Sequence, residues 1–316
     1  YEYGMFRQKL VEGWQTELPD FWLPGGKIWM QRVPEKSVEV HFDGHIEEQW
    51  HDQYHSVRHK DYQTIIAEPY DLLIAGKNGK GTNLLRIWKS ETNQFDMKLF
   101  NGGNYLRAME QSSMAEVVTK VLYPEDNHGD GKLLRLTQQY FLVSASIQDI
   151  IRRHLMSNST MDNFPELASI HLNDTHPVLA IPEMMRIMLD ECGYAWAEAW
   201  DIVQKTMAYT NHTVMSEAME CWSIDLFKMR LPRIYQIIEE INRRFWIEMG
   251  GKNVPHDEIK NMAPISDGFV KMANIAVIGT HSINGVSELH SNILKDDIFN
   301  KFYHQMPQKF TNVTNG

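Results

Sequence analysis

Three short apolar runs in the second half of the chain each end in a polar turn that contains a histidine and precedes a helix-like segment. They are residues 168–172 before the turn 173–177, residues 207–209 before 210–213, and residues 275–278 before 279–285. If the runs are parallel strands, right-handed crossovers bring their ends to one edge of the sheet. Open α/β sheets bind ligands at that edge, outside the carboxyl ends of their strands. We therefore expect His176, His212 and His281 at the carboxyl edge of one mostly parallel sheet.

The composition indicates a globular protein with an acidic surface. Hydrophobic residues make up 43% of the 316 residues, which is enough for a real core in one large α/β domain or two ordinary ones. Lys and Arg total 31 against 41 Asp and Glu, a net charge of −10, and no long basic block is available to neutralise a phosphate backbone. We therefore expect no nucleic acid among the partners.

Cysteines and apolar segments bear on the location of the protein. Cys192 and Cys221 are far apart and outside any Cys-x-x-Cys spacing, which argues against a disulfide framework or a thiolate zinc site and favours a cytoplasmic protein. No apolar stretch approaches the roughly 18 residues that span a bilayer, so we expect no membrane partner. The chain starts at Tyr1 without an initiator Met and stops at Gly316 directly after a turn-rich stretch, which suggests a fragment.

The first hundred residues are expected to be rich in β-strands. Residues 38–42 and 46–48 alternate apolar and polar side chains around Asp43-Gly44, which predicts a hairpin. Further short strands are predicted at 64–67, 71–75 and 82–88, with breaks at Pro69 and at residues 76–79. We expect these strands to add to the flank of the parallel sheet.

From Tyr105 onward the spacing of apolar residues lengthens to that of helices. Helices are predicted most clearly at 138–155, 182–191 and 234–249, the second with Pro182 at its start and Gly193 just past its end. No internal repeat or low-complexity linker is present. The sequence therefore predicts an α/β fold.

Each candidate site also has a structural interpretation. Asp174 and Thr175 could bind a ligand, but residues of these types also cap helices and turn the chain. His212 lies in a turn with more donors and acceptors than a cap requires, which favours a functional role, although a histidine satisfied by backbone groups is an alternative. Residues 279–285 resemble a Gly-rich phosphate cradle without forming Gly-x-Gly-x-x-Gly, so that signal is weak.

Two further segments have a similar ambiguity. Arg152-Arg153 could grip a phosphate bidentately, but at the end of a predicted helix they also favour the helix dipole, and the structural interpretation is preferred. The polar loop 124–131 has the length of a lid and equally that of an ordinary surface loop.

The residues by themselves leave three functions open. Three histidines at strand ends could hold a catalytic zinc ion, with Asp174 or Asp126 completing a metal hydrolase. Alternatively, the Asn, Thr, His and Asp groups could hydrogen-bond a polyhydroxylated substrate such as a sugar. The third possibility is a carbohydrate-binding or scaffolding domain that performs no chemistry.

Several motifs follow one another in the order of a known family. They are Tyr1-Glu2-Tyr3-Gly4-Met5-Phe6, Gly13-Trp14-Gln15, Asn101-Gly102-Gly103-Asn104-Tyr105, Val121-Leu122-Tyr123-Pro124, Gln148-Asp149-Ile150-Ile151-Arg152-Arg153, His171-Leu172-Asn173-Asp174-Thr175-His176-Pro177, Ala208-Tyr209-Thr210-Asn211-His212-Thr213-Val214, His281-Ser282-Ile283-Asn284-Gly285-Val286 and Thr314-Asn315-Gly316. Along its whole length the chain resembles the glycogen and starch (α-glucan) phosphorylases.

This resemblance implies a two-lobed, Rossmann-like glycosyltransferase of the GT-B type, of which the chain forms most of the N-terminal lobe. Residues 1–98 would be its β-rich part and residues 99–316 its α/β part. The family uses inorganic phosphate to remove a terminal glucose from an α-1,4-glucan, with retention of configuration, and releases glucose 1-phosphate. The resemblance also implies a homodimer, and pyridoxal phosphate as a cofactor whose phosphate exchanges protons with the substrate phosphate.

Site residues carry over by position. His212 matches the histidine whose side chain binds the glucose 6-hydroxyl and whose main-chain carbonyl lies near the reacting carbon, and Asn315 matches the asparagine that shares this hydroxyl. Asp126 and Asn127 match a flexible loop that gates the site. Residues that match the lining of the pocket are Arg135, Asp174, His176, Thr213 and Glu220. Arg152 and Arg153 match a pair that binds the phosphate of a nucleotide effector in regulated members.

The resemblance also indicates what this chain lacks. The family's second lobe, with the lysine that binds the cofactor and the basic groups around the substrate phosphate, is missing, so the resemblance implies no cofactor-binding residue here and no metal site. We expect the isolated chain to be inactive. His128-Gly129 stand where animal members carry aromatic residues that stack on purine inhibitors, which makes that inhibition doubtful.

Overall fold

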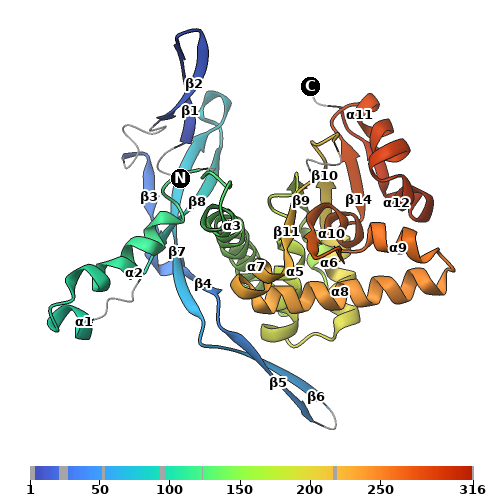
Figure 1. The fold of residues 1–316 in the computed structure, drawn as a ribbon, viewed down its shortest axis with the longest axis horizontal. Helices are drawn as coiled ribbons and strands as arrows, with labels where there is room; N and C mark the ends of the chain where they lie inside the picture. The colour runs from blue at the N-terminus through green and yellow to red at the C-terminus, as the bar shows by residue number, and fades with distance from the viewer. Residues whose placement is uncertain are drawn as a thin grey trace. The chain divides into compact units, whose positions relative to one another are not determined.

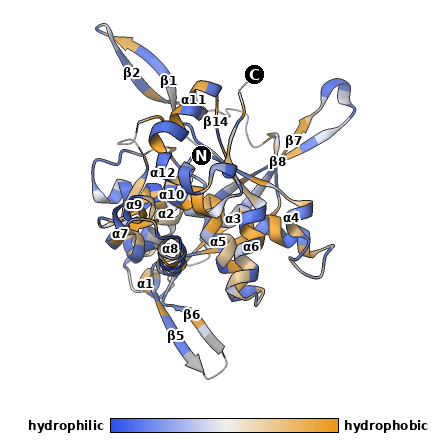
Figure 2. Cartoon of the chain, turned by 90° about the vertical axis from the view of Figure 1, so that its right-hand side faces the viewer, coloured by the Kyte–Doolittle hydropathy of each residue, from blue (hydrophilic) through white to orange (hydrophobic). Residues whose placement is uncertain are grey.

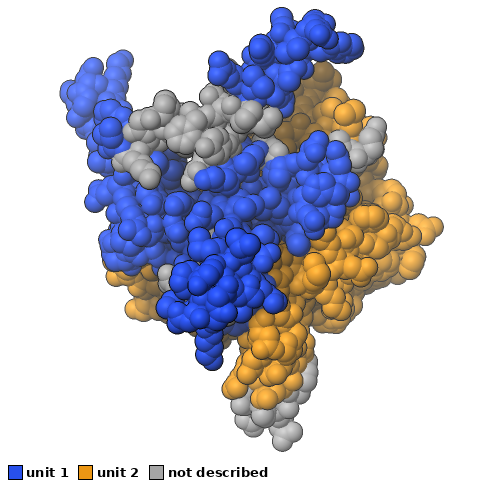
Figure 3. Space-filling view, turned by 60° about the vertical axis from the view of Figure 1, so that its left-hand side comes forward, with its two compact units in different colours: residues 1–42, 62–149 blue, residues 43–61, 150–316 orange. Residues whose placement is uncertain are grey.

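The computed structural model describes residues 4–20, 28–51, 54–92, 97–122, 124–215 and 219–314 (Figure 1). The chain forms two compact units: residues 1–42 with 62–149, and residues 43–61 with 150–316 (Figure 3). Each unit is described below by itself. The assignment of residues 1–316 to a single lobe remains a prediction.

The first unit is built on an antiparallel sheet. Its strands are β3 (Met30–Arg32), β4 (Val38–Phe42), β7 (Gln63–Ala75) and β8 (Thr82–Glu91), in the order β3-β7-β4 with β8 also paired to β7. The remaining elements are the hairpin β1 (Gly4–Val11) and β2 (Trp14–Asp20), the helices α1 (Met97–Asn101) and α2 (Tyr105–Val117), and α3 (Gly129–Leu155), which begins here and ends in the second unit. The predicted helix at 138–155 is confirmed within α3.

The predicted break at Pro69 is wrong, because β7 runs through it as one strand. Along one side, β7 pairs with β4 up to Ala67 and with β3 from Tyr70 onward, so Pro69 lies in the gap between these two partners. A proline lacks the N–H that a ladder requires, and here its carbonyl accepts instead from the Val33 N–H at 3.0 Å.

The hairpin predicted around Asp43-Gly44 is also wrong. Asp43 and Gly44 do turn the chain, with φ angles of 60° and 76°. However, β4 pairs with β7, whereas the next strand, β5 (His45–His51), pairs with β6 (Tyr54–Lys60). The turn therefore connects two strands that pair with different partners, and it does not form a hairpin.

The second unit contains a four-stranded sheet that is parallel throughout. Its strands are β9 (Ile170–Asn173), β10 (Met207–Thr210), β14 (Ser282–Gly285) and β15 (Phe310–Asn312), in the order β15-β14-β10-β9. The central side chains Leu172, Tyr209 and Ile283 are buried and form part of the core. This confirms a parallel sheet in a mixed α/β structure.

Helices and a small antiparallel sheet complete the second unit. The helices are α4 (Phe164–Leu167), α5 (Ala180–Arg186), the π-helix Ile187–Glu191, α6 (Trp196–Thr206), α7 (Ile224–Arg230), α8 (Pro232–Gly251), α9 (His256–Met262), α10 (Met272–Gly279), α11 (Glu288–Ile293), the π-helix Leu294–Ile298 and α12 (Asn300–Gln305). The small sheet comprises β11 (Cys221–Ser223), β12 (Ile265–Ser266) and β13 (Phe269–Lys271).

The helices carry both hydrophilic and hydrophobic residues, as the hydropathy colouring in Figure 2 shows. Helix α8 buries Ile234, Ile237, Ile238, Ile241 and Phe245 on one side. This is the helical spacing on which the prediction at 234–249 depended, and that prediction is confirmed. The prediction at 182–191 is confirmed by α5 and the π-helix that continues it.

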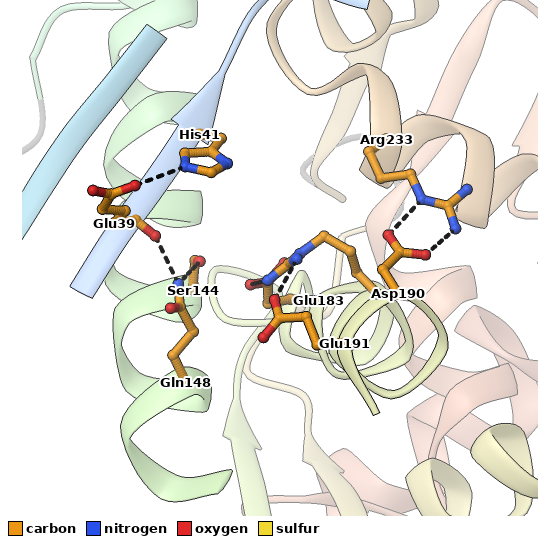
Figure 4. A network of polar contacts seen from close by, with 9 residues as sticks. Glu39, His41, Ser144, Gln148, Glu183, Asp190, Glu191 and Arg233 are labelled. Carbon is orange, nitrogen blue, oxygen red and sulfur yellow. Dashed lines mark hydrogen bonds and ion pairs between the residues drawn. The ribbon is translucent and has the colours of Figure 1, made fainter. Parts of the chain in front are cut away.

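Polar contacts attach helices to neighbouring elements within each unit (Figure 4). In the first unit, the Gln148 side chain on α3 donates to the main-chain carbonyl of Glu39 on β4 at 2.9 Å. In the second unit, Arg233 at the start of α8 donates to both carboxylate oxygens of Asp190 in the π-helix, at 2.9 and 2.6 Å. Such bidentate pairs fix orientation as well as distance.

The third predicted strand is wrong. Residues 275–278 belong to α10, in which seven of eight residues are buried, and the strand follows at β14. A short apolar run suits a buried helix and a buried strand equally well, so its sequence could not distinguish the two. His281 precedes β14, and its N–H donates to the Met207 carbonyl at 3.0 Å. It therefore lies at the amino edge of the sheet, opposite the ends of β9 and β10.

The expectation of strands added at the flank of the parallel sheet is wrong for the described residues. The strands before residue 92 pair only among themselves, in the antiparallel sheet and in two hairpins. Among the residues that the structure describes, no helix is both long enough and apolar enough to cross a membrane.

Candidate functional site

An asparagine stands at the carboxyl end of every strand of the parallel sheet. Asn173 and Asn312 end β9 and β15, Asn284 is the penultimate residue of β14, and Asn211 directly follows β10. Asn211 and Asn284 are buried, whereas Asn173 and Asn312 are exposed. The edge therefore offers amide donors and acceptors at two depths.

His212 follows Asn211 and is exposed at this edge. Its Nε2 forms a hydrogen bond with Oδ1 of Asn173 on the neighbouring strand. An amide oxygen can only accept, so Nε2 carries the proton in the neutral ring. The other ring nitrogen, Nδ1, is then an acceptor for a hydroxyl group.

Asp174 turns the chain at the end of β9. It adopts a φ angle of 67°, its N–H donates to the Thr210 carbonyl at 2.9 Å, and its Oδ1 accepts from the Thr175 N–H at 2.6 Å. It does not cap α5, whose N-cap position is Leu179. Asp174 and His176 are half-buried at this edge, so the first turn is where the sequence predicted it.

The Asn211 side chain organises the main chain after β10. Its Oδ1 accepts from the Thr213 N–H at 2.8 Å, and its Nδ2 donates to the Tyr209 hydroxyl at 3.0 Å. Its own N–H donates to the Asn284 carbonyl at 3.0 Å. His212 thus lies between two residues whose main chain is held by hydrogen bonds.

The turn after β14 has a structural role. Asn284 accepts at Oδ1 from the Thr210 hydroxyl, at 2.8 Å, and donates to the Gly285 carbonyl at 2.9 Å. A Cβ on Gly285 would lie 2.8 Å from the main-chain nitrogen of Ser291 in α11. Glycine is therefore required for close packing, which explains this part of the phosphate-cradle pattern. Gly279 lies in α10, against the Ile181 side chain.

Burial controls the protonation of the groups beneath the edge. Desolvation, with smaller contributions from the carboxylates of Asp174 and Glu220, raises the pKa of Tyr209, so its hydroxyl stays neutral and can donate. Desolvation likewise lowers the pKa of His290, whose ring is buried on α11. Glu220 is half-buried before β11, and its main-chain carbonyl accepts from the Met272 N–H at 3.2 Å.

Other predicted site residues lie elsewhere. Arg152 and Arg153 are half-buried and exposed, respectively, in the last turn of α3. In the first unit, Arg135 on α3 forms an ion pair with Asp126, and Asn127 is exposed in the same loop. Asn315 lies outside the described residues.

The arrangement required by the metal-hydrolase hypothesis is absent, because His281 lies at the opposite edge from His176 and His212. Among the residues that the structure describes, no three His, Cys, Asp or Glu side chains are grouped so as to hold a metal ion. Neutral hydrogen-bonding groups instead dominate the edge, and these suit a hydroxylated ligand.

Asn173, Asn211, Asn312 and His290 were not among the predicted site residues. The first three share a signal that could have been found, since each follows or ends a short strand. His290 is buried 79 positions from Asn211, its partner across the sheet edge, and no local pattern indicates that contact.

A family model and several similar proteins point to the same family. A family model described as carbohydrate phosphorylase matches residues 1–316. The chain is 43% identical over 318 residues to a glycogen phosphorylase of Bacillus subtilis (strain 168), which covers all of this chain and 39% of that protein. It is 43% identical over 329 residues to the muscle form of human glycogen phosphorylase, with the same coverage, and 44% identical over 323 residues to a Chlamydia trachomatis glycogen phosphorylase, 40% of which is covered. The chain thus spans about two fifths of the length of these relatives.

Proposed function

The chain belongs to the carbohydrate phosphorylase family, and we propose that the full-length protein that carries it is an α-glucan phosphorylase. It would use inorganic phosphate to cleave the terminal α-1,4-linked glucose with retention of configuration, and release glucose 1-phosphate. The names of the relatives support glycogen as one such glucan. We further propose that the chain is part of the N-terminal lobe of a GT-B type transferase and is inactive by itself.

The observation that carries this proposal is the state of His212. Its Nε2 is paired with Asn173, so its Nδ1 can accept a hydrogen bond at an edge composed mainly of amides and hydroxyls. A sugar hydroxyl is a suitable donor to such a nitrogen. The role that the family resemblance gives to His212, binding the glucose 6-hydroxyl, is therefore chemically available here.

The surrounding residues would form one wall of the glucose site. Asp174 and Thr213 flank His212 through the turn after β9 and the segment after β10, and both have main-chain N–H groups already used in hydrogen bonds. Their side chains, with those of His176 and Glu220, are proposed to line the pocket. Asn315 is proposed to share the 6-hydroxyl with His212.

The remaining assignments rest on the resemblance. Asp126 and Asn127 are proposed to belong to a loop that gates the site, and Arg135, which forms an ion pair with Asp126, to line the pocket. Arg152 and Arg153 at the end of α3 are proposed as a site for an effector phosphate, since two guanidinium groups suit bidentate binding.

Pyridoxal phosphate is the cofactor that we propose for the full-length protein. The described side chains at the carboxyl edge are amides, hydroxyls, imidazoles and carboxylates. This set does not fit the cofactor, because it includes neither an amine for a Schiff base nor cations for a phosphate. We therefore assign the cofactor to residues outside this chain, and the roles proposed above involve no step on it.

We propose that the full-length protein is a homodimer and that α2 contributes to the contact. Leu106, Met109 and Met114 on this helix are 88%, 51% and 65% exposed. Apolar side chains gathered on one short helix favour a protein partner over water. Sedimentation of the full-length protein, with Leu106→Glu as a comparison, tests this proposal: a dimer that Leu106→Glu weakens supports it.

An assay of the full-length protein tests the proposed activity. Glycogen or maltodextrin is incubated with and without inorganic phosphate, and the products are identified by NMR. Phosphate-dependent release of α-glucose 1-phosphate is expected. Free glucose formed without phosphate would indicate a hydrolase, and binding of glucan without any product would favour a binding domain. Either result would refute the proposal.

A further inference from the structure

His290 is a buried histidine to which the proposed function gives no role. It lies on α11 and is 6% exposed. Its ring bridges two segments: Nδ1 lies 3.2 Å from the main-chain nitrogen of Val286, and Nε2 lies 3.2 Å from Oδ1 of Asn211. The second contact connects α11 to the residue that directly precedes His212.

The direction of these hydrogen bonds follows from their partners. The Val286 N–H can only donate, so Nδ1 accepts and Nε2 carries the proton. Nε2 therefore donates to Oδ1 of Asn211, and burial keeps the ring neutral. Both polar atoms of the Asn211 amide are then hydrogen-bonded: Oδ1 accepts from His290, and Nδ2 donates to the Tyr209 hydroxyl.

The Asn211 amide in turn holds the main chain around His212. Its Oδ1 accepts from the Thr213 N–H as well as from His290, so the same oxygen connects the residues on both sides of His212. An inverted amide would place an NH2 group against two donors, so that both buried hydrogen bonds would be lost. The ring of His290 thus selects one orientation of Asn211.

We propose that His290 is a positioning residue for His212: through Asn211 it fixes the main chain from Asn211 to Thr213 in the conformation that binds the sugar. This inference rests on the proposed function, in which His212 contacts the glucosyl unit. His290 itself does not contact the substrate. Burial lowers the pKa of His290, and the nearby ring of His212 lowers it further.

Two substitutions in the full-length protein separate positioning from packing. His290→Gln keeps an N–H donor at the reach of Nε2, whereas His290→Phe keeps the ring and loses both polar atoms. The control is His154→Phe, since His154 is also a buried histidine of the second unit, and its Nε2 contacts the Thr160 carbonyl. All three variants are measured for kcat, KM and thermal unfolding.

At saturating glucan and phosphate we expect His290→Phe to lower kcat at least tenfold, His290→Gln to recover most of that loss, and His154→Phe to leave kcat within twofold. A kcat for His290→Phe within twofold of wild type would overturn the inference. So would equal losses in the Gln and Phe variants, because the donor would then be irrelevant.

A second measurement does not depend on activity. Hydrogen exchange of the segment 210–214 in the full-length protein reports on the Thr213 N–H, which we expect to exchange at least tenfold faster in His290→Phe than in His290→Gln. Equal exchange in these two variants would overturn the positioning role even if the enzyme is a phosphorylase. If wild type lacks phosphorolysis, the proposed function fails, and the exchange result still decides whether His290 holds this segment.

Discussion

Replacing His212 with Ala in the full-length protein tests the proposed site most directly. The ring is exposed and contacts Asn173, which is exposed too, so water can replace the lost contact in the free protein. We therefore expect the free energy of unfolding to change by no more than about 0.5 kcal/mol. In the complex, a sugar hydroxyl removed from water loses its acceptor, which costs about 1–3 kcal/mol.

That loss corresponds to a decrease in kcat/KM of about fivefold to 140-fold, because each 1.4 kcal/mol is about a factor of ten. The assay is phosphate-dependent release of glucose 1-phosphate across a range of glucan concentrations. His281→Ala is the matched control: this histidine is also exposed, but it lies at the amino edge of the same sheet, with Nδ1 3.3 Å from the Gln204 carbonyl. Wild-type kinetics in His212→Ala, or an equal loss in His281→Ala, would refute the reasoning.

Asn173→Ala separates the presence of the imidazole from its orientation. Without the Asn173 acceptor, the ring of His212 loses the hydrogen bond that fixes its orientation, and the share of molecules in which Nδ1 faces the sugar hydroxyl falls. We expect a smaller loss of kcat/KM, on the order of fivefold or about 1 kcal/mol. A loss larger than that of His212→Ala would contradict this order of effects.

Four further outcomes are expected. Gly285→Ala should destabilise the protein by about 1–3 kcal/mol, because the new Cβ would lie 2.8 Å from the Ser291 main-chain nitrogen, whereas Gly250→Ala, with nothing within 4 Å, should not; denaturant unfolding of both variants checks this. Burial lowers the pKa of Lys309 from 10.5 to about 8. At a pH between these two values, the Lys309 side chain is therefore protonated in the unfolded chain but neutral in the folded chain. Stability should therefore rise with pH by up to about 3 kcal/mol across this window, and Lys309→Met should flatten the rise; an unchanged slope would argue against it. Purified chain should contain no stoichiometric zinc by elemental analysis, and one zinc per chain would restore the metal-hydrolase hypothesis. The isolated chain should bind no pyridoxal phosphate and release no glucose 1-phosphate from glycogen; phosphorolysis by this chain, free of full-length enzyme, would show that it forms more of the site than proposed.

Periodicity predicted the helices well because burial acts on one face of each. The Ile residues of α8 recur at helical spacing, and the helix covers the predicted range and two further residues at each end. The first two strand-turn units were predicted for a similar reason, since apolar runs ending in polar residues match β9 and β10.

The errors arose where local pattern and tertiary context disagree. Residues 275–278 are all apolar because they lie in α10, where nearly every residue is buried. Nothing within this run distinguishes a buried helix from a central strand. Pro69 was expected to end a strand because the sequence does not show that its neighbours β3 and β4 leave a gap there. Similarly, the turn at Asp43-Gly44 has hairpin chemistry, but the choice of strand partners depends on segments about 20 positions away.

The charges near the carboxyl edge bear on which substrate of the proposed reaction this part of the chain would bind. Desolvation raises the pKa of Tyr209 most, and the nearby carboxylates of Asp174 and Glu220 raise it further. Carboxylates repel inorganic phosphate, whereas the hydroxyls of a neutral sugar can donate to carboxylates and to His212. If the proposed function is correct, we expect the described side chains of the edge to bind the glucosyl unit and not the substrate phosphate. Adding phosphate should accordingly leave the affinity of the isolated chain for maltodextrin unchanged, and a phosphate-dependent increase measured by calorimetry would place the substrate phosphate at this edge.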